Sequence, residues 1–177
     1  MSLKLMPIDS VNDAEHLVSF LSSNFFPFHL TAAPTEEEAR DRLANGVFSE
    51  PDNLAYWIEL DGVRVGFINF QEVLDGTPMI DIRLGDPHRG RSIAVAALGI
   101  GTSEVFNKYP DVNRIEGNTR SDNIAMRKVF ERNCYVKEAH YRKGWPVVNA
   151  DSLDSVAYAI IRCDWESGLT TPVDWNS

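Results

Sequence analysis

Cysteine and histidine are scarce in this sequence, which has two cysteines and four histidines among 177 residues. Cys134 and Cys163 lie far apart, and neither has a second cysteine or histidine at the short spacing typical of zinc sites. A metal centre and a disulfide framework are therefore not expected. We predict two reduced, buried thiols instead.

Long hydrophobic runs are also lacking. No segment approaches the roughly 18 consecutive apolar residues of a membrane-spanning helix, and the amino terminus has no basic segment followed by an apolar one. We therefore expect no membrane association and a cytoplasmic location.

Basic residues are outnumbered by acidic ones, 17 to 26, which gives a formal net charge of −9. Nucleic-acid binding is not expected, because phosphate recognition draws its affinity from clustered Lys and Arg. A cationic substrate is compatible with the negative field, although acidity also maintains solubility.

The chain has the length and composition of one globular domain, with 44% hydrophobic and 24% charged residues. We expect a single domain over 1–177, with a core over about 3–165 and a tail over 166–177. Hydrophobic periodicity and turn signals predict strands over 3–8, 54–60, 63–73, 79–84, 113–118, 135–142 and 155–162, and helices over 14–21, 36–44, 93–106 and 123–132. Alternating elements of this kind predict an α/β layer structure with a mixed sheet.

The segment 86–94, Asp-Pro-His-Arg-Gly-Arg-Ser-Ile-Ala, joins a predicted strand to a helix that is apolar on nearly every face. Its small residues let the backbone approach a ligand, and the helix start offers unpaired N–H groups and a positive dipole end. Arg89 and Arg91 add charge, so the turn suits a diphosphate. It is neither a Walker loop nor a dinucleotide-binding glycine motif. Taken alone, the turn is more typical of an ordinary solvated turn, because surface arginines are common.

This turn resembles the signature of the GNAT acetyltransferases, which is Arg or Gln, two residues, Gly, one residue, then Gly or Ala. Arg89 and Ala94 match it. Ser92 stands where the middle glycine is usual; a serine there can still cap the helix but narrows the approach of a pyrophosphate.

Two later segments carry the resemblance further. Residues 123–135 are similar to the family's asparagine, helix and Glu-Lys-Leu-Gly-Phe segment, with Cys134 in place of Gly and Tyr135 in place of Phe. Residues 154–165 resemble the closing strand of the subgroup that contains the ribosomal-protein N-terminal acetyltransferases. The matches follow the family's element order from residue 1 to 165.

The resemblance implies a mixed, mostly antiparallel sheet of about seven strands flanked by helices, and acetyl-CoA bound at the end of the strand that finishes at Leu84. It implies contacts from the pyrophosphate to the turn and from the pantetheine arm to Asn123, which can also simply cap its helix. Backbone N–H groups near Ile82–Leu84 are candidates for stabilising the oxyanion. The expected cofactor-binding set is Ile82, Leu84, Arg89, Gly90, Arg91, Ser92, Ile93, Ala94, Asn123 and Phe130.

The implied reaction is direct attack of a primary amine on acetyl-CoA in a ternary complex. An alkyl ammonium, with a reference pKa of roughly 10, must lose a proton first, directly or through water. Asp81 is the first candidate base, because many relatives carry a glutamate there, and Glu72 on the neighbouring strand is its competitor. Either acid can instead form a surface salt bridge with Arg83.

The sequence departs from the family at the general acid, the residue that protonates the leaving group. Relatives often protonate the departing thiolate with a Tyr or Ser, but the matching positions hold Met126 and Phe130. Water or Tyr141 could substitute, because a thiolate is already a tolerable leaving group. A non-catalytic acyl-CoA sensor is therefore the alternative function, and a structural or partner-binding domain is a third.

The aromatic loop Phe25-Phe26-Pro27-Phe28-His29 lies where relatives form an acceptor wall, although core packing explains it equally well. His29 is assigned no role. The acceptor is the amine of an unidentified small molecule, peptide or protein N-terminus. A homodimer is compatible with the sequence, but nothing in it requires one.

Overall fold

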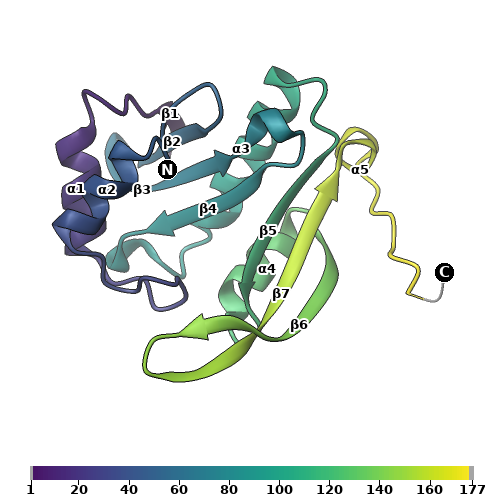
Figure 1. Cartoon of the computed structure of the whole chain (residues 1–177). Helices are drawn as coiled ribbons and strands as arrows, with labels where there is room; N and C mark the ends of the chain where they lie inside the picture. Colours follow the sequence, from purple (N-terminus) through teal and green to yellow (C-terminus); the bar gives the residue numbers. More distant parts are fainter. Residues whose placement is uncertain (1, 176–177) are drawn as a thin grey trace.

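The computed structural model describes residues 2–175, which form one seven-stranded sheet with helices on both faces (Figure 1). The elements are β1 (Leu3–Pro7), α1 (Ala14–Ser23), α2 (Glu36–Ala44), β2 (Leu54–Leu60), β3 (Val63–Gln71), η1 (Val73–Asp75), β4 (Met79–Leu84), η2 (Asp86–His88), α3 (Ile93–Lys108), β5 (Arg114–Arg120), α4 (Ile124–Arg132), β6 (Val136–Val147), β7 (Ala150–Ile161) and α5 (Arg162–Ser167). The strand order is β1-β2-β3-β4-β5-β7-β6, and only the β4–β5 pair is parallel. The predicted mixed, mostly antiparallel sheet is confirmed.

The alternation of β2 divides its side chains between the two faces of the sheet. Tyr56 and Ile58 belong to the core cluster that includes α3 and α4. Ala55 and Trp57 belong to the second cluster, under α1 and α2. Both faces are therefore covered in this half of the molecule.

Two local predictions hold in detail. Thr35 and Glu38 form a capping box at the start of α2, with the Glu38 N–H donating to Thr35 Oγ1 at 3.2 Å and the Thr35 N–H to Glu38 Oε2 at 2.8 Å. Asp61 and Gly62 have φ of 50° and 84°, as expected for the two-residue hairpin turn between β2 and β3.

Other boundaries differ from the prediction. β3 ends at Gln71, because Glu72 takes a left-handed conformation with φ 60° and starts η1. β6 and β7 extend well beyond the predicted 135–142 and 155–162 and pair with each other through Trp145↔Leu153. This part of the hairpin is mostly exposed on both strands, so it lacks the hydrophobic alternation of a half-buried strand. α5 begins at the end of β7 and shortens the expected tail.

Both cysteines are exposed, which corrects the expectation of buried thiols. Cys134 takes φ 61° directly after α4, the left-handed position where glycine is favoured. Within residues 2–175, no helix has the length and apolar character needed to cross a membrane.

The junction between β4 and β5 is the feature that creates a site. Met79↔Glu116 is the single register pair between them, next to a hydrogen bond of 3.0 Å from the Glu116 N–H to the Pro78 carbonyl. Beyond Met79 the two strands separate, and Figure 1 shows them running apart toward their carboxyl ends. β4 remains paired with β3, and β5 with β7, on their other edges.

Candidate active site

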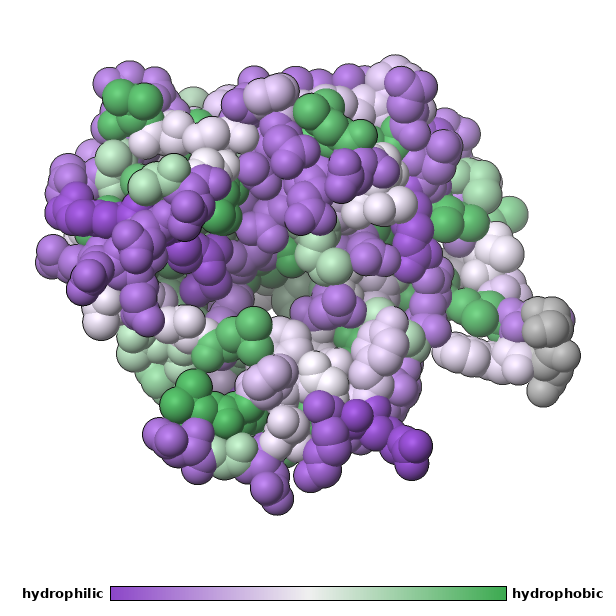
Figure 2. All heavy atoms as spheres, in the orientation of Figure 1, coloured by the Kyte–Doolittle hydropathy of each residue, from purple (hydrophilic) through white to green (hydrophobic). Residues whose placement is uncertain are grey.

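A cavity of about 780 Å³ opens where β4 and β5 separate, a size typical of small-molecule sites. In the space-filling view the visible face is largely hydrophilic and is hollowed near its centre. Hydrophobic side chains are visible inside the hollow (Figure 2). Every predicted cofactor residue lines this cavity: Ile82, Leu84, Arg89, Gly90, Arg91, Ser92, Ile93, Ala94, Asn123 and Phe130. Asp81 lines it too, whereas Glu72 does not.

Glu72 is therefore misplaced as a candidate base. It is exposed, beyond the end of β3, in the left-handed turn that leads into η1. The physical reason is the early end of the strand, which removes Glu72 from the alternation on which its assignment depended.

The turn at the start of α3 uses two left-handed residues, Gly90 with φ 71° and Ser92 with φ 60°. Ser92 thus has the backbone conformation for which the family's glycine is suited. Its hydroxyl makes no capping hydrogen bond, so the prediction that it caps the helix is wrong. The leading N–H groups of an α-helix have no intrahelical partner, and here that end faces the cavity through Ile93, Ala94 and Val95.

Arg89 is largely committed within the protein. Its Nε donates to the Leu84 carbonyl at 3.1 Å, and its Nη2 donates to the Phe25 carbonyl at 2.5 Å and pairs with Asp86 at 2.7 Å. These bonds tie the turn to the end of β4 and to the aromatic loop. Arg89 therefore positions the turn, and its charge lies beside the helix N-terminus.

Two cations that the sequence reasoning missed face the same turn from α4. Lys128 and Arg132 both line the cavity, and Arg132 Nη1 lies 3.5 Å from Ser92 Oγ. Their spacing of four residues places them on one face of the helix, a signal already present in the sequence.

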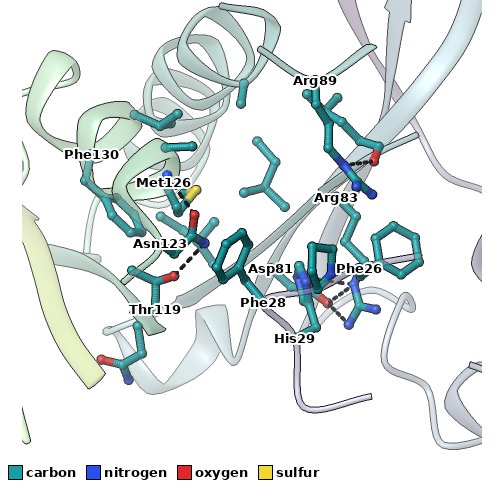
Figure 3. A pocket seen from close by; sticks show the side chains of 18 of the residues that line it. Phe26, Phe28, His29, Asp81, Arg83, Arg89, Thr119, Asn123, Met126 and Phe130 are labelled. Atoms are coloured by element: carbon teal, nitrogen blue, oxygen red, sulfur yellow. Dashed lines mark hydrogen bonds and ion pairs between the residues drawn. The ribbon is translucent and has the colours of Figure 1, made fainter. Parts of the chain in front are cut away.

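On the α4 side, Asn123 caps the helix as predicted. Its Oδ1 accepts from the Met126 N–H at 3.2 Å, and its Nδ2 donates to Thr119 Oγ1 at 2.9 Å. Phe130 is buried and stacks on Tyr158, with ring centroids 5.1 Å apart. Figure 3 shows Thr119, Asn123, Met126 and Phe130 together on one side of the cavity.

No tyrosine lines the cavity among the described residues. Tyr141 is half exposed on β6, where its register partner is Ser155 of β7. The suggestion that Tyr141 replaces the missing acid is therefore not supported by its place in the fold. The Thr119 hydroxyl, which sequence reasoning missed, does lie in the cavity.

The opposite side of the cavity holds a compact cluster of charge around Asp81, whose side chain is 13% exposed (Figure 3). Arg42 Nη2 donates to it at 2.9 Å and Arg83 Nε at 3.1 Å, while His29 Nε2 lies 3.3 Å away. The expected pair with Arg83 exists, but it is not a surface pair. The reason is that His29 of the aromatic loop and Arg42 of α2 contact Asp81, while the Phe26 ring packs against Arg83.

The environment of Asp81 decides its charge. Burial raises the pKa of the Asp81 carboxyl, but Arg83, His29 and Arg42 together outweigh burial and hold that pKa well below its usual range. A carboxylate held ionised so firmly is a weak proton acceptor. The role of Asp81 as the base stays a prediction, and this environment disfavours it.

The environment of His29 favours its neutral form. Burial lowers the pKa of its imidazole, and the Arg83 and Arg42 charges lower it further, against the opposing effect of Asp81. Its Nδ1 is buried without a partner among the described residues. His29 was assigned no role from the sequence, because the groups around it, Arg42 of α2 and Asp81 and Arg83 of β4, are distant from it in the chain.

The aromatic loop contributes both to the core and to the lining of the cavity. Phe26 is buried in the core cluster under α1, and the Arg83 guanidinium lies 5.0 Å from its ring centroid. Phe26 also lines the cavity, together with Pro27 and Phe28. Arg120 of β5 holds this part of the loop, donating to the Pro27 carbonyl at 2.9 Å and lying 5.0 Å from the Phe28 ring centroid. The loop thus bridges the two separated strands.

Known structures share this fold. The chain is similar to RimL, a ribosomal L7/L12 alpha-N-protein acetyltransferase in complex with coenzyme A, with a TM-score of 0.75 and 21% identity over 91% of this chain and 94% of RimL. Mycobacterium smegmatis RimJ gives a TM-score of 0.75 and 20% identity over 92% of this chain and 83% of its own. A spermidine N-acetyltransferase SpeG chimera from Vibrio cholerae and hSSAT gives 0.79 and 13% identity, over 94% of this chain and 99% of its own.

Sequence comparison supplies the family. A search of curated proteins found no match. The profile of the Acetyltransferase (GNAT) domain matches residues 2–135, which include the β4–turn–α3 unit and α4. The chain therefore belongs to the GNAT acetyltransferase family and is an acetyl-CoA-dependent N-acetyltransferase.

Proposed function

We propose that acetyl-CoA lies in the cavity with its pyrophosphate on the turn 89–94 and its acetyl group beside β4, and that the amine enters on the side of the aromatic loop. This placement is supported by one observation: a single cavity extends from the N-terminus of α3 to the charge cluster around Asp81. Donor and acceptor can then meet in one ternary complex, as direct transfer requires.

The charges along the donor end support this orientation. Arg91, Lys128 and Arg132 line the cavity near the helix N-terminus, where backbone N–H groups and positive charge suit phosphates. The pantetheine arm would pass Asn123 and the free edge of β4. Beyond Met79 the N–H groups on that edge have no partner strand in β5, so they are available to an amide or a thioester carbonyl.

In the proposed reaction the amine nitrogen attacks the thioester carbonyl carbon, the C–S bond breaks and CoA leaves as the thiolate. Backbone N–H groups near Ile82–Leu84 would stabilise the oxyanion. The proton lost by the amine passes to solvent, because Asp81 is held ionised by two arginines and is a weak proton acceptor. The thiolate leaves without a hydroxyl donor at positions 126 and 130, which hold Met and Phe. Nearby positive charge favours the neutral, reactive form of the amine.

The test pairs calorimetry with thiol release. The protein should bind CoA and should release free thiol from acetyl-CoA with at least one amine in a panel of amino acids, peptides, polyamines and aminoglycosides. CoA binding with no thiol release from any amine would favour the alternative, a non-catalytic acyl-CoA sensor. Absence of CoA binding would refute the donor placement.

The double variant Lys128→Glu, Arg132→Glu tests the phosphate end. It should weaken CoA binding roughly 100-fold, because two charge-assisted contacts at about 1.5 kcal/mol each are replaced by repulsion. Arg142→Glu is the matched control, because Arg142 is exposed on β6 outside the cavity. Equal CoA affinity in the double variant and in the control would contradict the placement.

A further inference from the structure

The acceptor end of the cavity has an excess of positive charge. Among the described residues that line the cavity, Asp81 is the only carboxylate. It faces two guanidinium groups, Arg42 from α2 and Arg83 from its own strand, and His29 Nε2 lies 3.3 Å from it. The local charge is therefore positive in a chain whose net charge is −9. The net negative charge of the chain therefore does not describe the electrostatic field at this end of the cavity.

This cluster also has more hydrogen-bond donors than its one carboxylate can accept. Each guanidinium carries five N–H donors. Arg83 is 4% exposed at its side chain, and its Nη1 is buried without a partner, as is Arg42 Nε. Arg42 Nη1 donates to no described residue, and the Arg42 side chain is 29% exposed and lines the cavity. Arg42 is thus the cluster's accessible cation.

The surroundings limit what can approach Arg42. Its guanidinium lies 5.7 Å from the centroid of the Phe48 ring, and the lining of the same cavity includes the apolar side chains of Phe28, Leu30 and Val47. Apolar walls strengthen charge-assisted hydrogen bonds to a ligand and make an unmatched charge costly. The group that would pair with the free N–H donors of Arg42 is therefore an anion or a strong hydrogen-bond acceptor on a compact molecule.

We infer that the acceptor is an amine that carries a carboxylate close to its nitrogen, as in an amino acid or a short peptide, and that Arg42 binds the carboxylate. This rests on the proposed function, which places the donor at the other end of the cavity. The positive cluster then selects the carboxylate and favours the neutral amine at the same time. Polyamines, which bring only positive charge, are disfavoured.

The experiment compares matched acceptors with the intact protein and acetyl-CoA. Each of the twenty amino acids, and a set of dipeptides, is assayed beside its carboxamide, with spermidine as a third arm. After correction for the fraction of neutral amine, the best carboxylate should exceed its carboxamide at least tenfold in kcat/KM. Equal or better use of the carboxamides or spermidine would overturn the inference. So would the absence of transfer to every carboxylate while CoA still binds.

Variants assign the selectivity to Arg42. Arg42→Gln should raise KM for the carboxylate acceptor at least tenfold and remove the preference over the carboxamide, with CoA affinity unchanged by calorimetry. Arg42→Lys, which keeps the charge opposite Asp81, should retain part of the preference and guards against misfolding as the cause. Arg40→Gln on the same helix is the control, because Arg40 is exposed and pairs with Glu15. A preference for the carboxylate that survives Arg42→Gln would refute the role of Arg42. If the unmutated protein does not bind CoA, the placement of the donor is refuted instead.

Discussion

At the scale of single residues, the cluster around Asp81 joins three segments of the chain at one end of the cavity. Asp81 neutralises part of the charge of Arg42 and Arg83, which approach it from different elements. Removing one partner of a buried ion pair is strongly destabilising, because the remaining charge stays buried without compensation. Asp81 therefore stabilises this end of the cavity.

Asp81→Asn should lower the free energy of unfolding by about 3 kcal/mol, because it leaves two guanidinium groups facing each other without an anion. Acetyl transfer should fall as well, since Arg42 loses its position. Urea denaturation measures the first effect and thiol release the second. Asp122→Asn is the control, because Asp122 pairs with Arg120 at an exposed site and its loss should cost well under 1 kcal/mol. Full stability of Asp81→Asn would contradict the assignment.

The same residue sets an acid dependence of stability. The folded-state pKa of Asp81 is depressed, so its stabilisation is fully present above the unfolded pKa of about 3.9 and is lost as the pH falls through the folded pKa. The stability difference between the unmutated protein and Asp81→Asn should therefore be constant above about pH 5 and shrink below about pH 4. Denaturation curves from pH 3 to 7 measure it. A difference that grows on acidification would have the wrong sign.

At the scale of elements, the strand–turn–helix unit from β4 to α3 combines the phosphate-type turn with a costly backbone conformation. Ser92 has φ 60° without a capping hydrogen bond from its hydroxyl. A non-glycine residue in the left-handed region costs roughly 1–2 kcal/mol. The family's glycine at this position avoids that cost.

Ser92→Gly should stabilise the protein by about 0.5–1 kcal/mol. This is the strain relieved in the left-handed conformation minus the larger entropy that the glycine backbone loses on folding. It should also strengthen CoA binding, because the backbone can approach the pyrophosphate more closely. Ser92→Ala is the control: it keeps the Cβ, loses no capping bond and should change stability little. Thermal melting and calorimetry measure both effects, and a Ser92→Gly variant no more stable than Ser92→Ala would refute the strain argument.

At the scale of the whole molecule, the sheet consists of two halves, β1–β4 and β5–β7, joined by one register pair. The Arg120 contacts to the aromatic loop, the α3–α4 packing and the shared hydrophobic core add to this junction. A ligand in the cavity would contact both halves, so its binding energy would stabilise their association.

Acetyl-CoA at about 100 times its Kd should therefore stabilise the folded protein by about 2.7 kcal/mol, which raises Tm by roughly 5–10 °C for a chain of this size. Pantetheine at the same concentration, which lacks the phosphates, should give a much smaller rise. Differential scanning fluorimetry measures both. Equal shifts from the two ligands would show that the turn and the α4 cations do not hold the phosphates.

Much of the fold could be predicted because its signals are local. The capping box at Thr35, the Asp61-Gly62 turn and the element order depend on neighbours in the chain, and they agree with the structure. Glu72 and Tyr141 failed as candidates because strand ends and edges are set by tertiary pairing. The extended β6–β7 hairpin was missed because its exposed strands bury no face of their own.

The sequence by itself determined the family and the helix cap at Asn123, and it led to the prediction that the turn 89–94 binds a diphosphate, since each depends on residue types at short spacings. Only the tertiary structure decided where β4 and β5 separate, and hence where a ligand fits. It also decided which groups surround Asp81, because Arg42, His29 and Arg83 contact it from three separate segments. The charge and proton affinity of a buried carboxylate depend on such neighbours, which spacing along a chain does not encode.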